Sequence, residues 1–404
     1  MWGRLAACAG LAGPPCRAYN RSQGVDYMAI RQLNRREFLL TGTALASAAG
    51  IGAKSKPVVS IVRIHNDNVA KAVEQAVDLL GGIRHVTKSV NTVMLKPNLV
   101  SPQKEATTKL AVVRALAEAM RRAGKEVSIG EGSAAAPKFN VLGTGIYRTR
   151  KRDILDPMQQ YVFEQLGYAD LAKTLRVPLV NLHSGDLVDV AVPGGFVFDK
   201  ITLHRSLAEV DLLCSVPMMK THQLATVTLG MKNLIGAFPG TVYQSVRGHM
   251  HDLASKVEPT AASAVVVDMV RANKLGLVVI DGSMAMEGNG PAMGKTFKMD
   301  VIVAGTNPVA TDMVGASLMG FAPAEVPAFL WANKAGLRPG ALDEIEIRGE
   351  RLDRVRRAFA KPQLQSWNVI RPYWGNRELS RNDYRGASAQ LMAALNVAGA
   401  PCNR

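Results

Sequence analysis

Residues 210–222 read VDLLCSVPMMKTH, a strongly apolar run that ends with a lysine and a histidine. Continuous apolar runs are typical of buried strands in parallel sheets, so residues 210–216 are predicted to form one. Residues 228–236, TLGMKNLIG, follow closely and place a second lysine and an asparagine between two glycines. Because open α/β sheets bind ligands at the carboxyl ends of their strands, this region is predicted to be a ligand site. Its catalytic candidates are Lys220, His222 and Lys232.

Apolar strand patterns alternate with helical patterns along most of the chain. The other predicted strands are residues 57–64, 92–95, 127–130, 277–280, 299–304 and 345–348. The predicted helices are residues 69–80, 109–123, 261–274 and 307–319. This alternation predicts an α/β fold with a mainly parallel sheet flanked by helices.

The alternation is interrupted in two places. Residues 134–205 are less regular and predict an inserted or covering subdomain within an α/β domain of residues 54–350. Short strands are predicted there near residues 178–181 and 187–192. Residues 351–404 are rich in Arg, Asn and Pro, and an irregular C-terminal tail is predicted for them.

Polar residues follow several of the predicted strands. A Lys-Pro-Asn sequence is often only a turn, and a Glu-Gly-Ser sequence is often only a helix cap. Repetition at four strand ends favours a binding site, because the ends of parallel strands meet at one edge of the sheet. A glycine-bounded turn can also present backbone N–H groups and an ammonium to an anion. The binding candidates are Lys96, Asn98, Glu131, Ser133, Gly230, Asn233 and Gly236.

Two histidines lie two residues apart shortly after this segment. His249 and His251 have a spacing that suits metal ligation from a strand or loop, but not from one face of a helix. Residues 281–291 are predicted to form a long glycine-rich loop after a strand, and its Asp281 and Glu287 would complete a divalent-metal site. The alternatives are that the histidines bind a phosphate or form hydrogen bonds within a loop.

The N-terminal region resembles an export signal. Arg35 and Arg36 precede Phe38 and a weakly apolar, small-residue stretch, so residues 28–53 are predicted to be a twin-arginine signal peptide. Residues 1–27 read as an extension before the true start at Met28. The prediction implies contact with the twin-arginine translocase and a periplasmic or otherwise exported location. The alternatives are a membrane anchor and a chance arginine pair before a core helix. The run is shorter than the ~20 residues of a spanning helix, so no stable membrane span is expected.

Charge and cysteine content restrict the partners. The formal net charge is +16, and residues 1–53 contribute six Arg or Lys and two Asp or Glu, which leaves +12 for the remainder. Aromatic residues are only 5% and no nucleic-acid motif is present, so a small anionic ligand is favoured over nucleic acid. The four cysteines form no CxxC pair, and no iron–sulfur cluster is expected.

Five motifs in order resemble the bacterial and archaeal family known as domain of unknown function 362. They are residues 96–98, 217–222, 230–236, 281–288 and 307–312, and the resemblance spans about residues 57–350. Many members carry a twin-arginine leader. Some carry a ferredoxin-like cluster domain, whose cysteines this chain lacks.

A shorter segment is similar to the nickel-pincer lactate racemase family. The similar positions are Lys232, the Pro239-Gly240 pair and His249. In that family a lysine holds a pincer cofactor, while histidines ligate nickel and move protons. The paired glycines that precede the lysine there are missing here.

Two functions fit these residues. The first is an enzyme that acts on a small anionic substrate by proton or hydride transfer. Lys220 and Lys232 would then bind the anion or tether a cofactor, and His222 would be the general acid or base. The second is a binding or cofactor-assembly protein that captures an anion or a metal cofactor without turnover.

Overall fold

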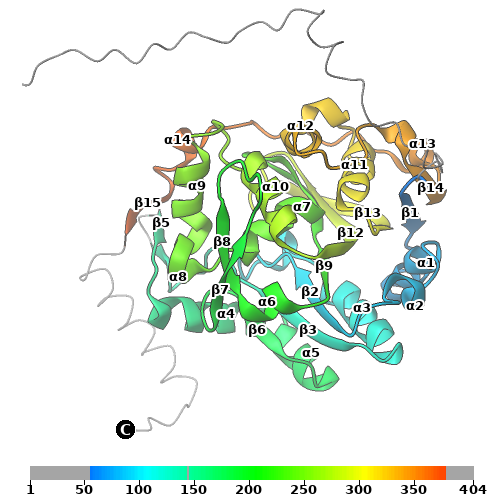
Figure 1. The fold of residues 1–404 in the computed structure, drawn as a ribbon, viewed down its shortest axis with the longest axis horizontal. Helices are drawn as coiled ribbons and strands as arrows, with labels where there is room; N and C mark the ends of the chain where they lie inside the picture. Colours follow the sequence, from blue (N-terminus) through cyan, green and yellow to red (C-terminus); the bar gives the residue numbers. More distant parts are fainter. Residues whose placement is uncertain (1–54, 143–144, 379–404) are drawn as a thin grey trace, which may run out of the picture. The chain divides into compact units, whose positions relative to one another are not determined.

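A ten-stranded mixed sheet runs through the computed structural model, which describes residues 55–142 and 145–378 (Figure 1). The strand order is β14-β1-β13-β12-β9-β2-β3-β6, and β10 joins β12 and β11 outside this path. Only β13 on the path pairs antiparallel to its neighbours among the described strands. The predicted α/β fold with a mainly parallel sheet is therefore confirmed. The path strands are β1 (Val58–Arg63), β2 (Thr92–Pro97), β3 (Glu126–Glu131), β6 (Leu179–Asn181), β9 (Leu212–Val216), β12 (Leu275–Glu287), β13 (Lys295–Gly305) and β14 (Glu346–Gly349).

Both faces of the sheet are covered, which explains the continuous apolar runs of its strands. In β2, Val93 and Leu95 pack into one apolar core, while Met94 points into the other. The first core includes residues of α1 (Val69–Asp78), α3 (Leu110–Arg122), α4 (Arg152–Gln165) and α5 (Tyr168–Leu175). The second includes residues of α7 (Gly230–Asn233), α10 (Ser263–Ala272), α11 (Pro308–Leu318) and α12 (Pro327–Lys334). Burial on two sides leaves polar groups room only at the strand ends.

Local signals place the helix ends close to where the sequence predicts them. Asn68 caps α1 by accepting a hydrogen bond from the N–H of Lys71 at 3.0 Å. Asn307 caps α11 in the same way, with Pro308 in the first turn, where a missing N–H costs nothing. Gly124 follows α3 at a φ of +78°, a left-handed conformation that glycine adopts without strain.

The strand order changes direction between β2 and β9. From β2 the chain moves outward through β3 to β6, and then returns to β9 on the other side of β2. Such a reversal opens a crevice at the carboxyl ends of the two strands, because their connections leave in opposite directions. Lys96 and Pro97 end β2, and Ser215 and Val216 end β9, so polar and apolar groups meet at this point.

After β9 the chain re-enters the sheet instead of forming a loop. β10 (Met218–His222) pairs parallel with β12 and antiparallel with β11 (Thr226–Thr228). β12 continues as a strand to Glu287, so the prediction of a loop from Asp281 onward is wrong for its first half. Pairing of Glu287 with Lys295 keeps this part extended, despite its glycines.

The less regular segment from 134 to 205 contributes to the main sheet through its edge strand β6. It also holds α4, α5 and a hairpin of β7 (Leu187–Ala191) and β8 (Lys200–His204). α6 (Arg205–Glu209) leads from this hairpin into β9. A small sheet of β4 (Val141–Leu142), β5 (Gly145–Arg148) and β15 (Trp374–Glu378) lies apart from the main one.

The segment after β14 is more ordered than its composition predicts. It forms α13 (Leu352–Val355) and α14 (Trp367–Ile370). We call residues 350–373 the strap. The backbone N–H of Gln365 donates to the carbonyl of Gln223, and that of Trp367 donates to the carbonyl of Pro259, so these hydrogen bonds fix the strap to two loops. The remaining short elements are α2 (Ile83–Val86), α8 (Gly240–Tyr243), α9 (Gly248–Ala254) and the 3-10 turns Lys104–Ala106, Leu234–Ala237, Ser245–Arg247, Pro323–Glu325 and Leu342–Glu344.

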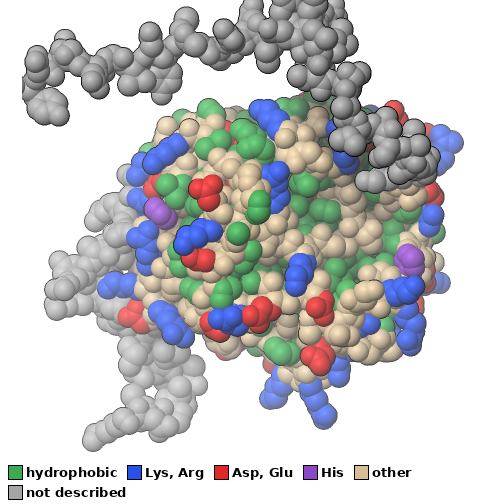
Figure 2. All heavy atoms as spheres, in the orientation of Figure 1, with side chains coloured by type: hydrophobic (Ala, Val, Ile, Leu, Met, Phe, Trp, Pro, Cys, Tyr) green, Lys and Arg blue, Asp and Glu red, His purple; other side chains and the backbone are tan. Residues whose placement is uncertain are grey.

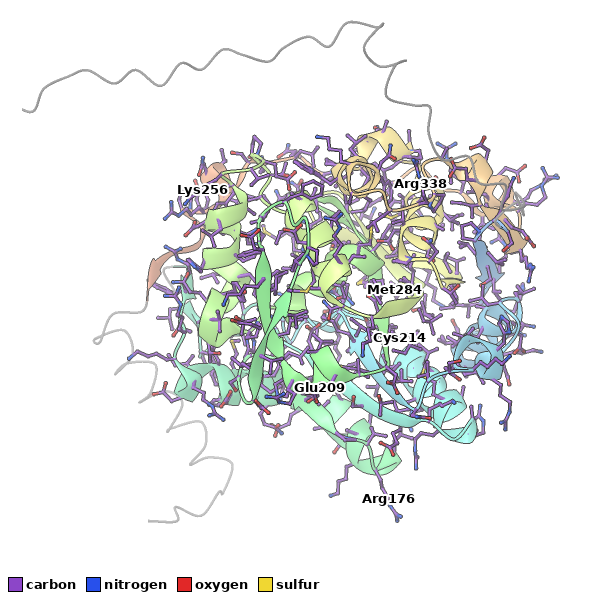
Figure 3. All side chains as sticks on the ribbon, viewed as in Figure 1. Arg176, Glu209, Cys214, Lys256, Met284 and Arg338 are labelled. Atoms are coloured by element: carbon purple, nitrogen blue, oxygen red, sulfur yellow. The ribbon has the colours of Figure 1, made fainter. Side chains whose placement is uncertain are left out.

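Several predictions fall outside the described residues. These are the extension of residues 1–27, the signal peptide of residues 28–53, the far end of the tail, and Cys8, Cys16 and Cys402. Cys214 is described, and Figure 3 places it within the sheet, where it is buried with a free thiol. No helix in the described part of the chain is long and apolar enough to cross a membrane.

Candidate functional site

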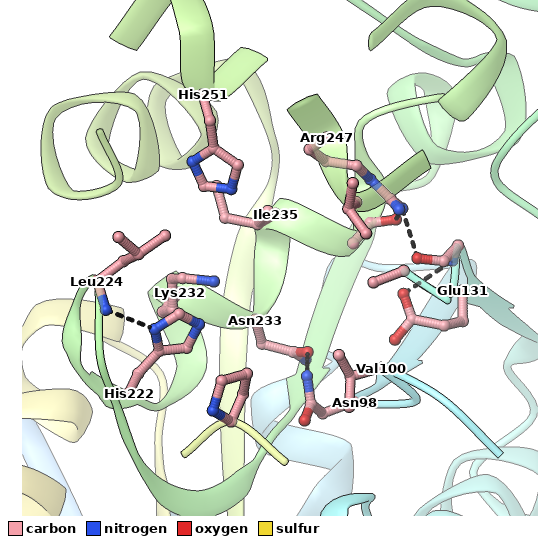
Figure 4. A pocket seen from close by; sticks show the side chains of 15 residues that line it. Asn98, Val100, Glu131, His222, Leu224, Lys232, Asn233, Ile235, Arg247 and His251 are labelled. Atoms are coloured by element: carbon pink, nitrogen blue, oxygen red, sulfur yellow. Dashed lines mark hydrogen bonds between the residues drawn. The ribbon is translucent and has the colours of Figure 1, made fainter. Parts of the chain in front are cut away.

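A cavity of about 100 Å³ lies where the strand order reverses (Figure 4). It is bounded by the ends of β2, β3 and β10, by α7, and by the chain from Val246 to α9. The side chains that contribute polar atoms to its walls are Asn98, Glu131, His222, Lys232, Asn233, Arg247 and His251. Figure 4 shows Lys232 and the two imidazoles on one side, with Arg247 and Glu131 on the other.

Lys96 and Glu131 form a buried ion pair at the closed side of the cavity. Lys96 Nζ lies 2.8 Å from Glu131 Oε1, and the two side chains are 0% and 2% exposed. The carboxylate also accepts backbone N–H groups of Gly132 at 2.8 Å and Leu99 at 2.9 Å. Burial lowers the pKa of Lys96, and the charge of Glu131 opposes that shift. Three donors therefore bind the carboxylate of Glu131, and its charge is used within the protein.

Asn233 links the two central strands to the cavity. Its amide Nδ2 donates to the Lys96 carbonyl and to Ser215 Oγ, both at 3.0 Å. Its Oδ1 accepts a hydrogen bond from Asn98 Nδ2 at 3.0 Å. Asn98 Oδ1 is buried and has no partner among the described residues, so it remains available as an acceptor.

Asp312 of α11 fixes the start of α7. Its carboxylate accepts the N–H groups of Gly230 at 2.7 Å and Met231 at 2.8 Å, which α7 itself leaves unpaired. Burial raises the pKa of Asp312 to about 7. A side chain at Gly230 would place its Cβ 2.5 Å from Val278, so close packing on β12 requires glycine there.

Gly236 lets the chain pass directly over the ion pair. A Cβ at this position would lie 2.3 Å from Glu131 Oε1 and 2.7 Å from Lys96 Nζ. The two glycines predicted as binding residues therefore act by allowing close approach, one to β12 and one to the ion pair.

Lys232 presents an ammonium to the cavity without a directly paired carboxylate, although the charge of Glu131 acts on it from the opposite wall. Its Nζ has no hydrogen-bond or ion-pair partner among the residues that the structure describes. Burial, followed by the charges of Lys96 and Arg247, lowers the pKa of Lys232 to about 7. The amine is thus shared between its charged and neutral forms near neutral pH.

Lys220 lies behind the cavity wall and is fully buried. Its Nζ donates to the Ala106 carbonyl at 2.6 Å, and the methionines Met218 and Met286 lie in the adjoining apolar cluster. Burial, followed by repulsion from Lys232, lowers the pKa of Lys220 to about 7. Lys220 therefore adds positive potential to the site without reaching into it.

The two cavity histidines are neutral and have opposite tautomers. His222 Nδ1 accepts the N–H of Leu224 at 3.0 Å, so the proton of its neutral ring lies on Nε2. His251 Nδ1 lies 2.7 Å from the Ala261 carbonyl, which can only accept, so this ring carries its proton on Nδ1. Burial holds the pKa of His222 well below its usual value and lowers that of His251 to about 3. His222 therefore offers an N–H donor at Nε2, and His251 offers the lone pair of its Nε2 as an acceptor.

Arg247 enters the cavity from a strained turn. Gln244, Val246 and Arg247 have φ values of 67°, 51° and 58°, which non-glycine residues rarely adopt. The guanidinium donates to the carbonyls of Gly132, Ser133 and Gly236. Backbone strain of this kind persists where the surroundings fix it, and it is concentrated at functional sites.

The described charges around the cavity do not balance. Lys96, Lys220, Lys232 and Arg247 are buried or half-buried within it or beside it, and Glu131 is the one carboxylate in its described lining. Removing uncompensated charges from water is costly, so such a cluster favours an anion in the cavity. Figure 2 shows a different distribution on the surface, where acidic groups lie among the Lys and Arg side chains of that face.

Ser133 and Asp281, both predicted as site residues, lie outside this cavity. Ser133 donates its N–H to Gln159 Oε1 at 2.6 Å and accepts Arg247 at its carbonyl, so it supports the arginine from behind. Asp281 accepts the N–H of Lys109 at 2.7 Å, directly before α3, and also bonds Ser283. It therefore orients neither His222 nor a metal.

The four residues predicted to share a metal are not brought together. His249 and His251 lie on a helix, α9, so their spacing points them to different sides, and only His251 reaches the cavity. Glu287 accepts the N–H of Ala360 at 3.1 Å and lies 4.0 Å from Arg357, near the strap. Within the described part of the chain, no three His, Cys, Asp or Glu side chains form a group that could hold a metal ion.

Three residues that support the site were not singled out for it from the sequence. Arg247 follows no strand pattern, and its position depends on the rare backbone conformation before it. Asp312 belongs to a motif that the family resemblance includes, but its partner lies 82 residues away. Trp367 stacks on His251 with ring centroids 4.6 Å apart, from a segment predicted to be irregular.

Comparisons with individual known proteins give limited likenesses. The thylakoid-associated protein sll1697 of Synechocystis is 27% identical over 267 residues, which cover 65% of this chain and 74% of that protein. The lactate racemase apoprotein of Thermoanaerobacterium thermosaccharolyticum is similar to 68% of this chain, with 12% identity and a TM-score of 0.39. A structural-genomics protein from Thermotoga maritima is similar to 60% of it, with 16% identity and a TM-score of 0.33.

These structural likenesses do not indicate what this chain binds or which reaction it performs. The matched part of this chain spans 59% of the racemase chain and 56% of the Thermotoga maritima chain. The sequence similarity to the racemase family rests on Lys232, the Pro239-Gly240 pair and His249, of which only Lys232 lines the cavity. By contrast, a family model matches residues 93–317, more than half of the chain, and includes β2, β9, β10 and α7. The chain therefore belongs to the family described as domain of unknown function, DUF362.

Proposed function

We propose that this protein is an enzyme that binds a small anion in the cavity beside α7 and moves a proton on it. The observation that carries the proposal is the excess of basic side chains around Lys232, whose ammonium has no described partner. An anion there would restore the charge balance and raise the pKa of both Lys220 and Lys232. The cavity of about 100 Å³ restricts the ligand to a few non-hydrogen atoms.

His222 and His251 support the proton-transfer part of the proposal. Because the rings are neutral and oppositely protonated, His222 Nε2 can donate to a ligand oxygen, while His251 Nε2 can accept a hydrogen bond and pass a proton on. Burial lowers the pKa of His251 to about 3, so this ring carries the proton only in transit. Trp367 holds the second ring in a stacked position. A site that only captured an anion would need donors alone, so the free acceptors at His251 and Asn98 favour an enzyme over a binding protein.

Calorimetric titration tests the anion site directly. Oxalate, acetate and inorganic phosphate are titrated into the wild-type protein and into Lys232→Met at pH 6.5. The proposal expects at least one of these anions to bind, and the variant to lose at least tenfold in affinity, about 1.4 kcal/mol. Lys256→Met is the matched control, because Lys256 is exposed at the end of α9 (Figure 3). Equal binding by wild type and Lys232→Met would contradict the proposal.

Export by the twin-arginine route is a separate part of the proposal. It rests on Arg35 and Arg36 before the small-residue stretch of the leader. Residues 28–60 fused to a reporter that folds in the cytoplasm should be exported, and the Arg35→Lys, Arg36→Lys double variant should remain inside. Export of the double variant at the same rate would contradict this route.

A further inference from the structure

One amine among the four basic side chains at the cavity differs from the others. Lys96 is paired with Glu131, Lys220 donates to the Ala106 carbonyl, and Arg247 donates to three backbone carbonyls. These contacts hold each of the three groups in place. The Nζ of Lys232 lines the cavity with no such contact among the described residues.

This environment favours the nucleophilic form of an amine. A lysine becomes a nucleophile when desolvation and neighbouring cations lower its pKa, because only the neutral amine has a free lone pair. Burial and the charges of Lys96 and Arg247 act on Lys232 in that direction, and its pKa is about 7.

The atoms around Lys232 match the groups of an amine–carbonyl adduct. A carbonyl oxygen needs a donor, which His222 supplies at Nε2. The hydroxyl that replaces it needs acceptors, and His251 Nε2 and Asn98 Oδ1 are free for that purpose. The positive potential of Lys220 and Arg247 suits a carboxylate next to the reacting carbon.

We propose that Lys232 forms an imine with the carbonyl carbon of a small oxo acid bound in this cavity. The proposal rests on the anion site described above and names the class of its substrate. The fraction of Lys232 that stays neutral when the carboxylate of the oxo acid is bound attacks the carbonyl carbon through its Nζ lone pair. A C–N bond forms, and the C=O π bond breaks towards oxygen. Both amine protons pass to that oxygen, relayed by His251 Nε2. The C–O bond then breaks, water leaves and C=N remains, so no oxidant or further reactant is needed.

Reductive trapping tests the step. The protein is incubated with glyoxylate or pyruvate and sodium cyanoborohydride at pH 7, and adducts are located by intact mass and peptide mapping. At this pH exposed lysines are almost entirely protonated, so a single adduct at Lys232 is expected. Lys232→Arg, which keeps the charge but is not a nucleophile, should form at least tenfold less adduct. Lys256→Arg, altered at an exposed lysine, should react like the wild type.

The outcomes separate this proposal from the one on which it rests. If the wild type binds oxalate, which has no ketone or aldehyde, but forms no reducible adduct at Lys232 between pH 6 and 9, the imine is excluded and the anion site stands. If neither binding nor adduct is found, both proposals fail. An adduct spread evenly over exposed lysines, or undiminished in Lys232→Arg, would also overturn the imine.

Discussion

The two sides of the cavity use lysine in opposite ways. On the side of β2 and β3, Lys96 is paired with Glu131, and the carboxylate is further held by two backbone N–H groups. On the side of β10 and α7, Lys220 and Lys232 form no ion pair with a carboxylate among the described residues. The first arrangement stabilises the end of the sheet and the second leaves charge for a ligand. Proximity of basic groups to a strand end therefore does not tell which of them bind.

The largest effect is expected when the balanced side is broken. Glu131→Gln leaves Lys96 buried without a counter-charge and should reduce the free energy of unfolding by about 3–5 kcal/mol. Chemical denaturation followed by circular dichroism measures this. The double variant Lys96→Met, Glu131→Gln, which removes both charges, should recover part of the loss. A single variant as stable as the wild type would show that the pair does not support the fold.

On the unbalanced side the expected effect depends on pH and is smaller for each pH unit. The folded-state pKa of Lys220 is about 7, below the usual value of 10.5, so between these values the unfolded chain binds more protons. The ligand-free protein should therefore gain stability as pH rises from about 7 to 10, by at most about 1.4 kcal/mol per pH unit from this group. Denaturation at several pH values should show a flatter profile for Lys220→Met. An unchanged slope would mean that Lys220 titrates normally in the folded protein.

The smallest effect is expected at the strap. Trp367→Phe keeps an aromatic ring against His251 but loses the hydrogen bond from Nε1 to Asp252 at 2.8 Å, which should cost about 1 kcal/mol. Trp367→Leu also removes the stacking and should change anion affinity as well as stability. Titration of both variants with the anion that the wild type binds separates the two contributions. Equal affinities in the two variants would leave the strap with a structural role alone.

The fold was predictable because its signals are local. An apolar run such as residues 210–216 predicts a buried strand from its own composition. The cap at Asn307 likewise predicts the start of the helix that follows it. The convergence of Lys96, Asn98, Glu131, Asn233 and Lys232 on one cavity also followed from strand ends meeting at one edge.

The remainder depends on contacts that no local pattern contains. Pairing with β13 keeps β12 extended past Asp281, and this carboxylate reaches the start of α3 instead of the cavity. His249 and His251 sit on a short helix, which separates two side chains that a strand would have presented together. Arg247 owes its place to left-handed residues whose conformation only the folded surroundings impose.

The central claim is that the cavity is built for an anion and that Lys232 gains a proton when the anion binds. Calorimetric titration of the bound anion at pH 7.5, in buffers of different ionisation enthalpy, measures the protons exchanged on binding. Because Lys220 and Lys232 both have a pKa of about 7, each is mostly neutral at this pH. The account predicts net uptake of about one proton by the wild type, and clearly less by Lys232→Met. Binding without proton uptake, or uptake that is unchanged in Lys232→Met, would contradict it.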